Sequence, residues 1–157
     1  MNRQLRDRTR RDDIDFGEVS SSLGFLLRLA QVKVFESFFA SLAHLGLRPG
    51  EFTVLWVIGL NPGVPQGVIA RRLQIKPAHM TKLVQRAVDA QLVERCVPDD
   101  DRRSVHLRLS SAGERFVAET KPAFLDVIAA ENTHLDDEEF ATLIRLLRKF
   151  NGMEEPQ

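Results

Sequence analysis

The sequence predicts a mainly α-helical fold that carries one small β-hairpin, and its central third supplies three observations for this. The first is a short segment with apolar residues at helical spacing: Val68, Ile69 and Leu73. The second is a longer segment, after a tight connection at 75–77, with one apolar helix face: Met80, Leu83, Val84, Ala87 and Val88. The third is a pair of β-like runs, Leu92–Val97 and Val105–Leu109, around a charged loop. Two short helices followed by such a hairpin indicate a winged helix-turn-helix.

Helices are also predicted on both sides of this region, over residues 15–44, 49–60, 111–132 and 137–150. Asp15-x-x-Glu18 and Asp136-x-x-Glu139 have the spacing of capping boxes and are expected to begin the first and last of these helices, with Ser20–Ser22 as alternative caps for the first. Ser110 or Ser111 is expected to cap the third helix, and Pro122 is expected to kink it or interrupt its hydrogen-bond ladder.

The order of these elements predicts three parts of the chain. Residues 1–14 are charged and poor in large apolar groups, so we expect a flexible N-terminal arm. Residues 48–110 form the predicted winged helix-turn-helix. Residues 15–47 and 111–157 are expected to form a helical dimerisation region, because their apolar faces exceed what one small domain covers.

Composition narrows the class of protein. The chain has 157 residues, 43% of them hydrophobic, and no apolar run near the length of about 20 residues that spans a bilayer. A single cysteine excludes a disulfide framework, and the Arg-rich start is unlike a signal peptide, so a cytoplasmic protein is expected. The four histidines are scattered, and no catalytic or phosphate-binding motif is present. We therefore expect no metal, no cofactor and no enzymatic activity.

Charge is distributed unevenly although the net charge is zero. Residues 66–110 hold nine Lys or Arg against five Asp or Glu, a net charge of +4. Residues 111–157 hold five against ten, a net charge of −5. A basic segment within a neutral chain suits a protein with one DNA-facing side, whereas ordinary surface charge is the alternative.

Two motifs identify a family. Asp101-Arg102-Arg103-Ser104 in the hairpin loop and Leu109-Ser110-x-x-Gly113 after it resemble the MarR (multiple antibiotic resistance regulator) family of bacterial transcription factors. The resemblance runs from about Ser21 to Phe150 and implies a six-helix winged helix-turn-helix dimer. The chain departs from the family at four positions: the family favours Thr at Ser110, Gly at Gln91, and small capping hydroxyls at Arg48 and Pro65.

The candidate DNA contacts follow from the motif. In a helix-turn-helix the start of the second helix enters the major groove, and here that end carries Lys76, Pro77, His79, Thr81 and Lys82. A solvated helix face is the alternative for this composition. One turn later, Arg86 has three possible roles: bracing the fold, reaching a phosphate or reading a base.

The hairpin loop supplies a second set of candidate contacts. Arg102 and Arg103 are candidates for a minor groove. Arg103 has the alternative of a structural ion pair with Asp101, a loop-stabilising role that the family resemblance also implies.

The resemblance further implies double-stranded DNA with an inverted repeat, a second copy of the chain and a small effector as partners. Family members commonly bind aromatic acids or related anions, so a small aromatic acid or an aromatic acyl-CoA is expected to relieve repression. The candidate effector residues are Arg28, Phe39, His44, Arg48 and Trp56, with ordinary core or surface positions as the alternative.

Other interpretations of the function are a winged helix that binds protein and an activator without an effector. Some family members sense oxidation through a cysteine in the first helix. Cys96 lies in the hairpin instead, so no redox control is expected.

Overall fold

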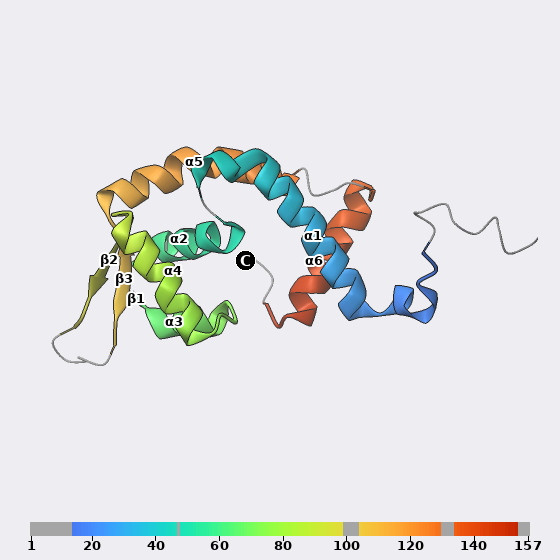
Figure 1. Ribbon diagram of the computed structural model, residues 1–157, viewed down its shortest axis with the longest axis horizontal. Helices are drawn as coiled ribbons and strands as arrows, with labels where there is room; N and C mark the ends of the chain where they lie inside the picture. Colours follow the sequence, from blue (N-terminus) through green and yellow to red (C-terminus); the bar gives the residue numbers. More distant parts are fainter. Residues whose placement is uncertain (1–13, 47, 99–103, 130–133, 154–157) are drawn as a thin grey trace, which may run out of the picture. The chain divides into compact units, whose positions relative to one another are not determined.

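The computed structural model describes residues 14–46, 48–98, 104–129 and 134–153. Over these residues the chain forms six α-helices and a small antiparallel sheet (Figure 1). The mainly α-helical winged helix-turn-helix predicted from the sequence is confirmed. Two 3-10 turns, Gly17–Ser21 and Ala43–Leu45, flank the first helix. The remaining elements are α1 (Leu23–Leu42), α2 (Pro49–Leu60), β1 (Val64–Pro65), α3 (Gln66–Arg72), α4 (Pro77–Asp89), β2 (Val93–Cys96), β3 (His106–Leu109), α5 (Ser111–Ala129) and α6 (Asp137–Phe150).

Residues 1–36 and 37–157 form separate compact units, so α1 passes from one into the other. In the first unit, the predicted capping box at Asp15 does not begin an α-helix. The Asp15 carboxylate instead accepts the Gly17 N–H at 2.9 Å, and a 3-10 turn precedes α1. The predicted arm, apart from Ile14, lies outside the described residues.

The second unit contains the winged helix-turn-helix lobe, which we define as residues 48–110. Figure 1 shows α2, α3 and α4 grouped beside the three strands. The strand order is β1-β3-β2, and Cys96 pairs with His106 at the loop end of the β2–β3 hairpin. The sequence predicted the hairpin but missed β1, because two residues that include a proline give no strand signal. β1 is held by the Gly63 N–H donating to Leu107 O and the Gln66 N–H donating to Val105 O.

Two hydrophobic clusters stabilise the second unit. The lobe cluster joins α2, α3, α4 and the sheet, and its fully buried members are Leu55, Ile58, Ile69, Met80, Val84 and Leu107. The aromatic cluster joins the end of α1, the start of α2 and α5 through Phe38, Leu42, Phe52 and Val127, with Trp56 and Phe124 packed against them. Because α2 contributes to both clusters, it fixes the lobe against α5.

The last two helices follow the predicted capping pattern. Ser110 begins α5, and the helix continues through Pro122, which removes one N–H donor from its ladder. The Asp136 carboxylate accepts the Glu139 N–H at 2.8 Å and the Glu139 carboxylate accepts the Asp136 N–H at 2.9 Å, so the predicted capping box is confirmed. In the described part of the chain, no helix is long and apolar enough to cross a bilayer.

Candidate nucleic-acid interface

Helix α4 presents two chemically different faces. Pro77 occupies its first turn, where the missing N–H removes no helical bond, and Lys76 precedes it in extended conformation. Met80, Leu83 and Val84 lie on one face and are buried in the lobe cluster. Packing of these three side chains leaves the opposite face in solvent, and there the structure places all the candidates that the sequence assigned to α4 and its cap: Lys76, Pro77, His79, Thr81, Lys82 and Arg86.

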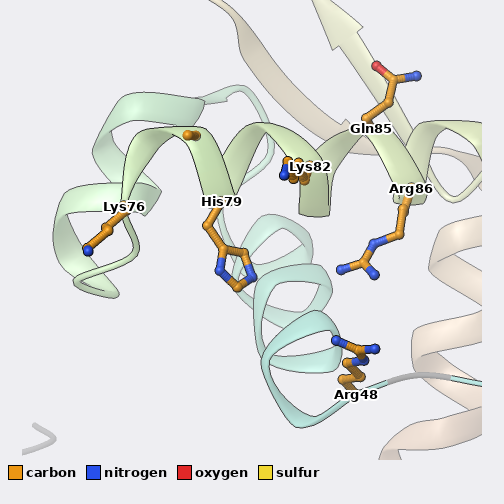
Figure 2. Close-up of a pocket in the computed structure, with 7 residues that line it drawn as sticks. Arg48, Lys76, His79, Lys82, Gln85 and Arg86 are labelled. Atoms are coloured by element: carbon orange, nitrogen blue, oxygen red, sulfur yellow. The ribbon is translucent and has the colours of Figure 1, made fainter.

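An open hollow of about 680 Å³ lies against this exposed face. Its lining side chains include four cations and no carboxylate: Arg48, Lys76, Ala78, His79, Lys82, Gln85 and Arg86. Figure 2 shows His79 and Arg86 extending from α4 on the side where Arg48 lies, whereas Gln85 points the opposite way. A hollow lined by cations concentrates positive potential, so it attracts an anionic partner such as a phosphate backbone.

Some side chains along this face form hydrogen bonds or ion pairs within the protein, and others form none among the described residues. The Thr81 hydroxyl donates to Pro77 O at 3.0 Å and accepts from the Gln66 amide at 3.3 Å. The Gln85 amide donates to Asp89 at 2.7 Å and accepts from Arg95 of β2 at 2.8 Å, which ties α4 to the hairpin. The other candidates include Lys76, His79 and Lys82. Within the described ranges, the side chains of these three residues form no hydrogen bond or ion pair.

Arg86 is bound to a neighbouring helix. Its guanidinium lies 2.6 Å from the carboxylate of Glu51, which is in the first turn of α2. Of the three roles that the sequence left open for Arg86, this contact favours bracing. Sequence reasoning did not select Glu51, although its position three residues after Arg48, at the start of α2, is the spacing of a helix cap.

The hairpin carries additional cations on its strands. Arg108 of β3 forms an ion pair with Glu94 of β2 at 2.7 Å, so two exposed side chains of opposite charge neutralise each other. The predicted loop contacts Arg102 and Arg103, and the predicted stabilising residue Asp101, lie outside the described residues. Cys96 is exposed on β2.

The motif after the hairpin has a local structural explanation. The Ser110 hydroxyl donates to Gln91 O at 2.5 Å and accepts the Gly113 N–H at 3.0 Å, so it caps α5 and ties it to the end of α4. A Cβ on Gly113 would lie 2.0 Å from Leu92 O, so this close approach requires glycine. Gln91 adopts a φ of 59° where the family favours glycine, and the side chain is therefore accommodated at a strained position.

Arg48 and Pro65, the two other departures from the family, precede α2 and α3 at the position of the helix cap. Neither cap resembles one formed by Ser or Thr. Neither Arg48 nor Pro65 makes a side-chain cap hydrogen bond. At Arg48 the hydrogen bond instead runs from the backbone of the cap residue to a side chain inside the helix, because the Arg48 N–H donates to the Glu51 carboxylate at 2.9 Å. The departures therefore change helix caps and leave the exposed face of α4 intact.

The candidate effector residues are distributed over several sites. Trp56 packs against Phe52 and Phe124, with ring centroids 5.7 and 5.3 Å away, and the Lys121 ammonium lies 5.4 Å from its ring. This position favours the core alternative for Trp56. His44 is exposed, and so is Phe39, whose ring meets the edge of Phe38.

Two other effector candidates lie elsewhere. Arg48 lines the cationic hollow and also a smaller one of about 320 Å³ between α2 and α4. Arg28 belongs to the first unit and is exposed.

Known proteins resemble this chain in sequence and in fold. A model of the MarR family matches residues 45–104, which include α2, α3, α4 and β2. A protein of Thauera aromatica described as a transcriptional regulatory protein for the hcr operon is 29% identical over 134 residues, which are 85% of this chain and 81% of the relative. Residues 45–104 of the chain belong to the MarR family. The family predicted from the sequence is thus confirmed, and with it the class of DNA-binding transcriptional regulator.

Solved structures agree with this assignment. The repressor CouR, bound to a 23-mer DNA duplex, is 29% identical, with a TM-score of 0.80 over 88% of this chain and 98% of CouR. A transcriptional regulator from Pseudomonas aeruginosa is 25% identical, with a TM-score of 0.78 over 84% of this chain and 98% of that structure. The six-helix MarR-like fold predicted from the sequence is therefore confirmed.

Proposed function

We propose that this MarR-family protein is a homodimeric repressor that binds an inverted-repeat operator and is released by a small aromatic ligand. The cationic hollow against α4 carries this proposal, because it gathers positive charge on the helix that a helix-turn-helix inserts into the major groove. The similarity to CouR, a repressor bound to a DNA duplex, supports the same function.

Lys76, His79 and Lys82 are the proposed principal contacts to DNA. They lie in the first two turns of α4 or at its cap, and all three are exposed. Lys and His side chains there can donate to base edges and phosphates, while Pro77 and Thr81 of the same turns can contact the groove. The hairpin arginines Arg102 and Arg103 are proposed as minor-groove or phosphate contacts, with Asp101 stabilising their loop.

A homodimer is proposed because large apolar side chains outside the lobe have no cover within their own units. Helix α6 buries no residue, and Phe150 is 66% exposed. The first unit exposes a comparable set of apolar side chains: Ile14, Phe16, Val19, Leu23, Leu26, Leu27 and Leu29. Exposed apolar surface of this extent marks an interface, and a second copy of the same chain is the proposed occupant.

Selection from a random duplex library with the full-length protein tests the repressor model. We expect enrichment of an inverted repeat whose half-sites are about 10 base pairs apart, one helical turn, because two-fold symmetry repeats the α4 contact. Binding to the selected duplex is expected to weaken steeply with salt. Enrichment of an asymmetric single site would contradict the dimer, and the absence of enrichment would contradict sequence-specific binding.

The effector is proposed to be an aromatic carboxylic acid or its coenzyme A thioester. Phe39, His44 and Arg48 are exposed polar or aromatic groups near the junction of α1 and α2, and Trp56 and Lys121 place a cation beside an aromatic ring. Such groups suit an aromatic anion. A ligand releases the operator only if it binds the DNA-free form more tightly, so the operator should weaken ligand binding by the same factor.

Calorimetric titration of aromatic acids and their thioesters, with and without the selected operator, tests the release mechanism. A lower ligand affinity in the presence of the operator is the expected result. Equal affinity in the two titrations would contradict release by differential binding, even if the ligand bound tightly.

A further inference from the structure

Glu51 occupies a junction between the DNA-facing helix and the rest of the second unit. One oxygen of its carboxylate accepts the Arg48 N–H at 2.9 Å, and the other lies 2.6 Å from the Arg86 guanidinium. The Glu51 side chain is only 12% exposed, whereas that of Arg86 is 51% exposed. A nearly buried anion therefore holds one end of a cation whose other side faces the cationic hollow.

The position of Glu51 in α2 makes this contact specific. The next residue, Phe52, is fully buried in the aromatic cluster, and its ring centroid lies 4.5 Å from that of Phe124. Val54, Leu55 and Ile58 then bury the following turns in the lobe cluster. Because both clusters fix the start of α2, the Glu51 carboxylate is a fixed point against which Arg86 is held.

We propose that Glu51 is a positioning residue for DNA recognition, which withholds Arg86 from the phosphates of a bound duplex. Operator contact by α4 is then left to Lys76, His79 and Lys82, which have no such partner among the described residues. The inference rests on the proposed function and deepens it, because it assigns opposite roles to cations that line one hollow.

The chemistry of the pair supports a role in the affinity for DNA rather than in the stability of the protein. An ion pair with one half-exposed partner contributes little to the free energy of unfolding, because solvent screens it. The pair nevertheless determines where an arginine lies. An arginine released into the hollow would meet any nearby phosphate, and phosphate contacts strengthen binding to all sequences alike.

Replacing Glu51 with Gln in the full-length protein tests this role. The amide oxygen can still accept the Arg48 N–H, so the cap of α2 is retained while the charge that holds Arg86 is removed. We expect roughly tenfold tighter binding to the operator and to unrelated duplexes alike, with the ratio of the two affinities unchanged, because a phosphate contact carries no sequence information. The slope of log affinity against log salt should steepen by up to about two for the dimer, one new phosphate contact per subunit.

Two comparisons separate this mechanism from a general effect of charge. Glu114→Gln removes the same charge from the first turn of α5, at an exposed position, and should leave the salt slope and both affinities unchanged. Arg86→Ala alone should leave the slope unchanged, and adding Glu51→Gln to Arg86→Ala should have no further effect on it. Thermal melts of each variant establish that the lobe remains folded.

The outcomes that overturn the inference are specific. An unchanged slope and unchanged affinities in Glu51→Gln would show that Glu51 does not withhold Arg86. A shallower slope in Arg86→Ala would show that Arg86 already contacts phosphate in the native protein. Failure of the native protein to bind any duplex in a salt-dependent way would instead overturn the proposed function, so the two failures are distinguishable.

Discussion

The winged helix-turn-helix lobe and helix α6 differ in how far their apolar side chains are buried. In the lobe, Ile58, Met80 and Leu107 are completely buried within one chain. On α6, by contrast, Leu146 is 50% and Phe150 66% exposed, although the helix is well capped. The lobe thus closes its own core, whereas α6 presents an apolar face that its own unit leaves exposed. The contrast supports our proposal that DNA recognition and subunit assembly belong to separate parts of the chain.

Removal of α6 is expected to have the largest effect among the changes that test this difference between the lobe and α6. Deleting residues 138–157 should leave a chain that is insoluble or unfolded, because the apolar faces of the remaining helices lose their proposed partner surface. Analytical ultracentrifugation and circular dichroism check this prediction. A soluble, folded monomer would contradict it.

A point substitution tests the same contrast in the full-length protein. Leu146→Glu places a charge on the apolar face of α6 and should dissociate the dimer. Arg145→Glu also introduces a carboxylate on α6, on the opposite side of the helix by helical spacing, and should leave the dimer intact.

Within the lobe, Gly113 offers the next largest effect. Gly113→Ala should destabilise the protein by about 3 kcal/mol, because the added Cβ would meet the Leu92 carbonyl and force the start of α5 away from the sheet. Gly67→Ala is the matched control, since its Cβ would meet only the end of Arg71 at 4.0 Å. Chemical denaturation of both variants measures the difference. Equal stability of the two variants would mean that the close approach at Gly113 does not constrain the fold.

A smaller effect of opposite sign is expected at Gln91. Its φ of 59° suits glycine, so Gln91→Gly should stabilise the lobe by about 1 kcal/mol. Gln74, with a φ of 53° at the end of α3, should behave in the same way. Thermal unfolding of the two variants checks this, and a lower melting temperature in both would contradict the account of strain.

The sequence predicts those parts of the structure that depend on the spacing of residue types within one helix. The apolar face of α4 and the capping box at Asp136 follow from residue types and their spacing, and the structure has both. For α5 the sequence left the cap open between Ser110 and Ser111, and the structure has it at Ser110. The charged face of α4 follows from the same periodicity, because burial of Met80 and Val84 determines which side chains remain in solvent.

Contacts between elements were not predictable in this way. The Glu51–Arg86 pair joins residues 35 positions apart, and each residue taken alone is an ordinary charge on a helix. The pairing of Val64 with Leu107 and of Pro65 with His106 likewise depends on how the chain folds back on itself. The cations of α4 with and without a partner among the described residues therefore became distinguishable only when the neighbouring helices and strands were in place.

The most direct test of the account removes one lysine from each of the two contrasted regions. Lys82 lies on the exposed face of α4, and Lys149 lies in the last turn of α6, so Lys82→Ala and Lys149→Ala delete the same exposed charge. Affinity for the selected operator, measured by fluorescence anisotropy at fixed salt, should fall about tenfold or more in Lys82→Ala, as expected for a lost groove contact. Lys149→Ala should bind as the native protein does. Equal affinity of the two variants would contradict the central claim that the first two turns of α4 recognise DNA.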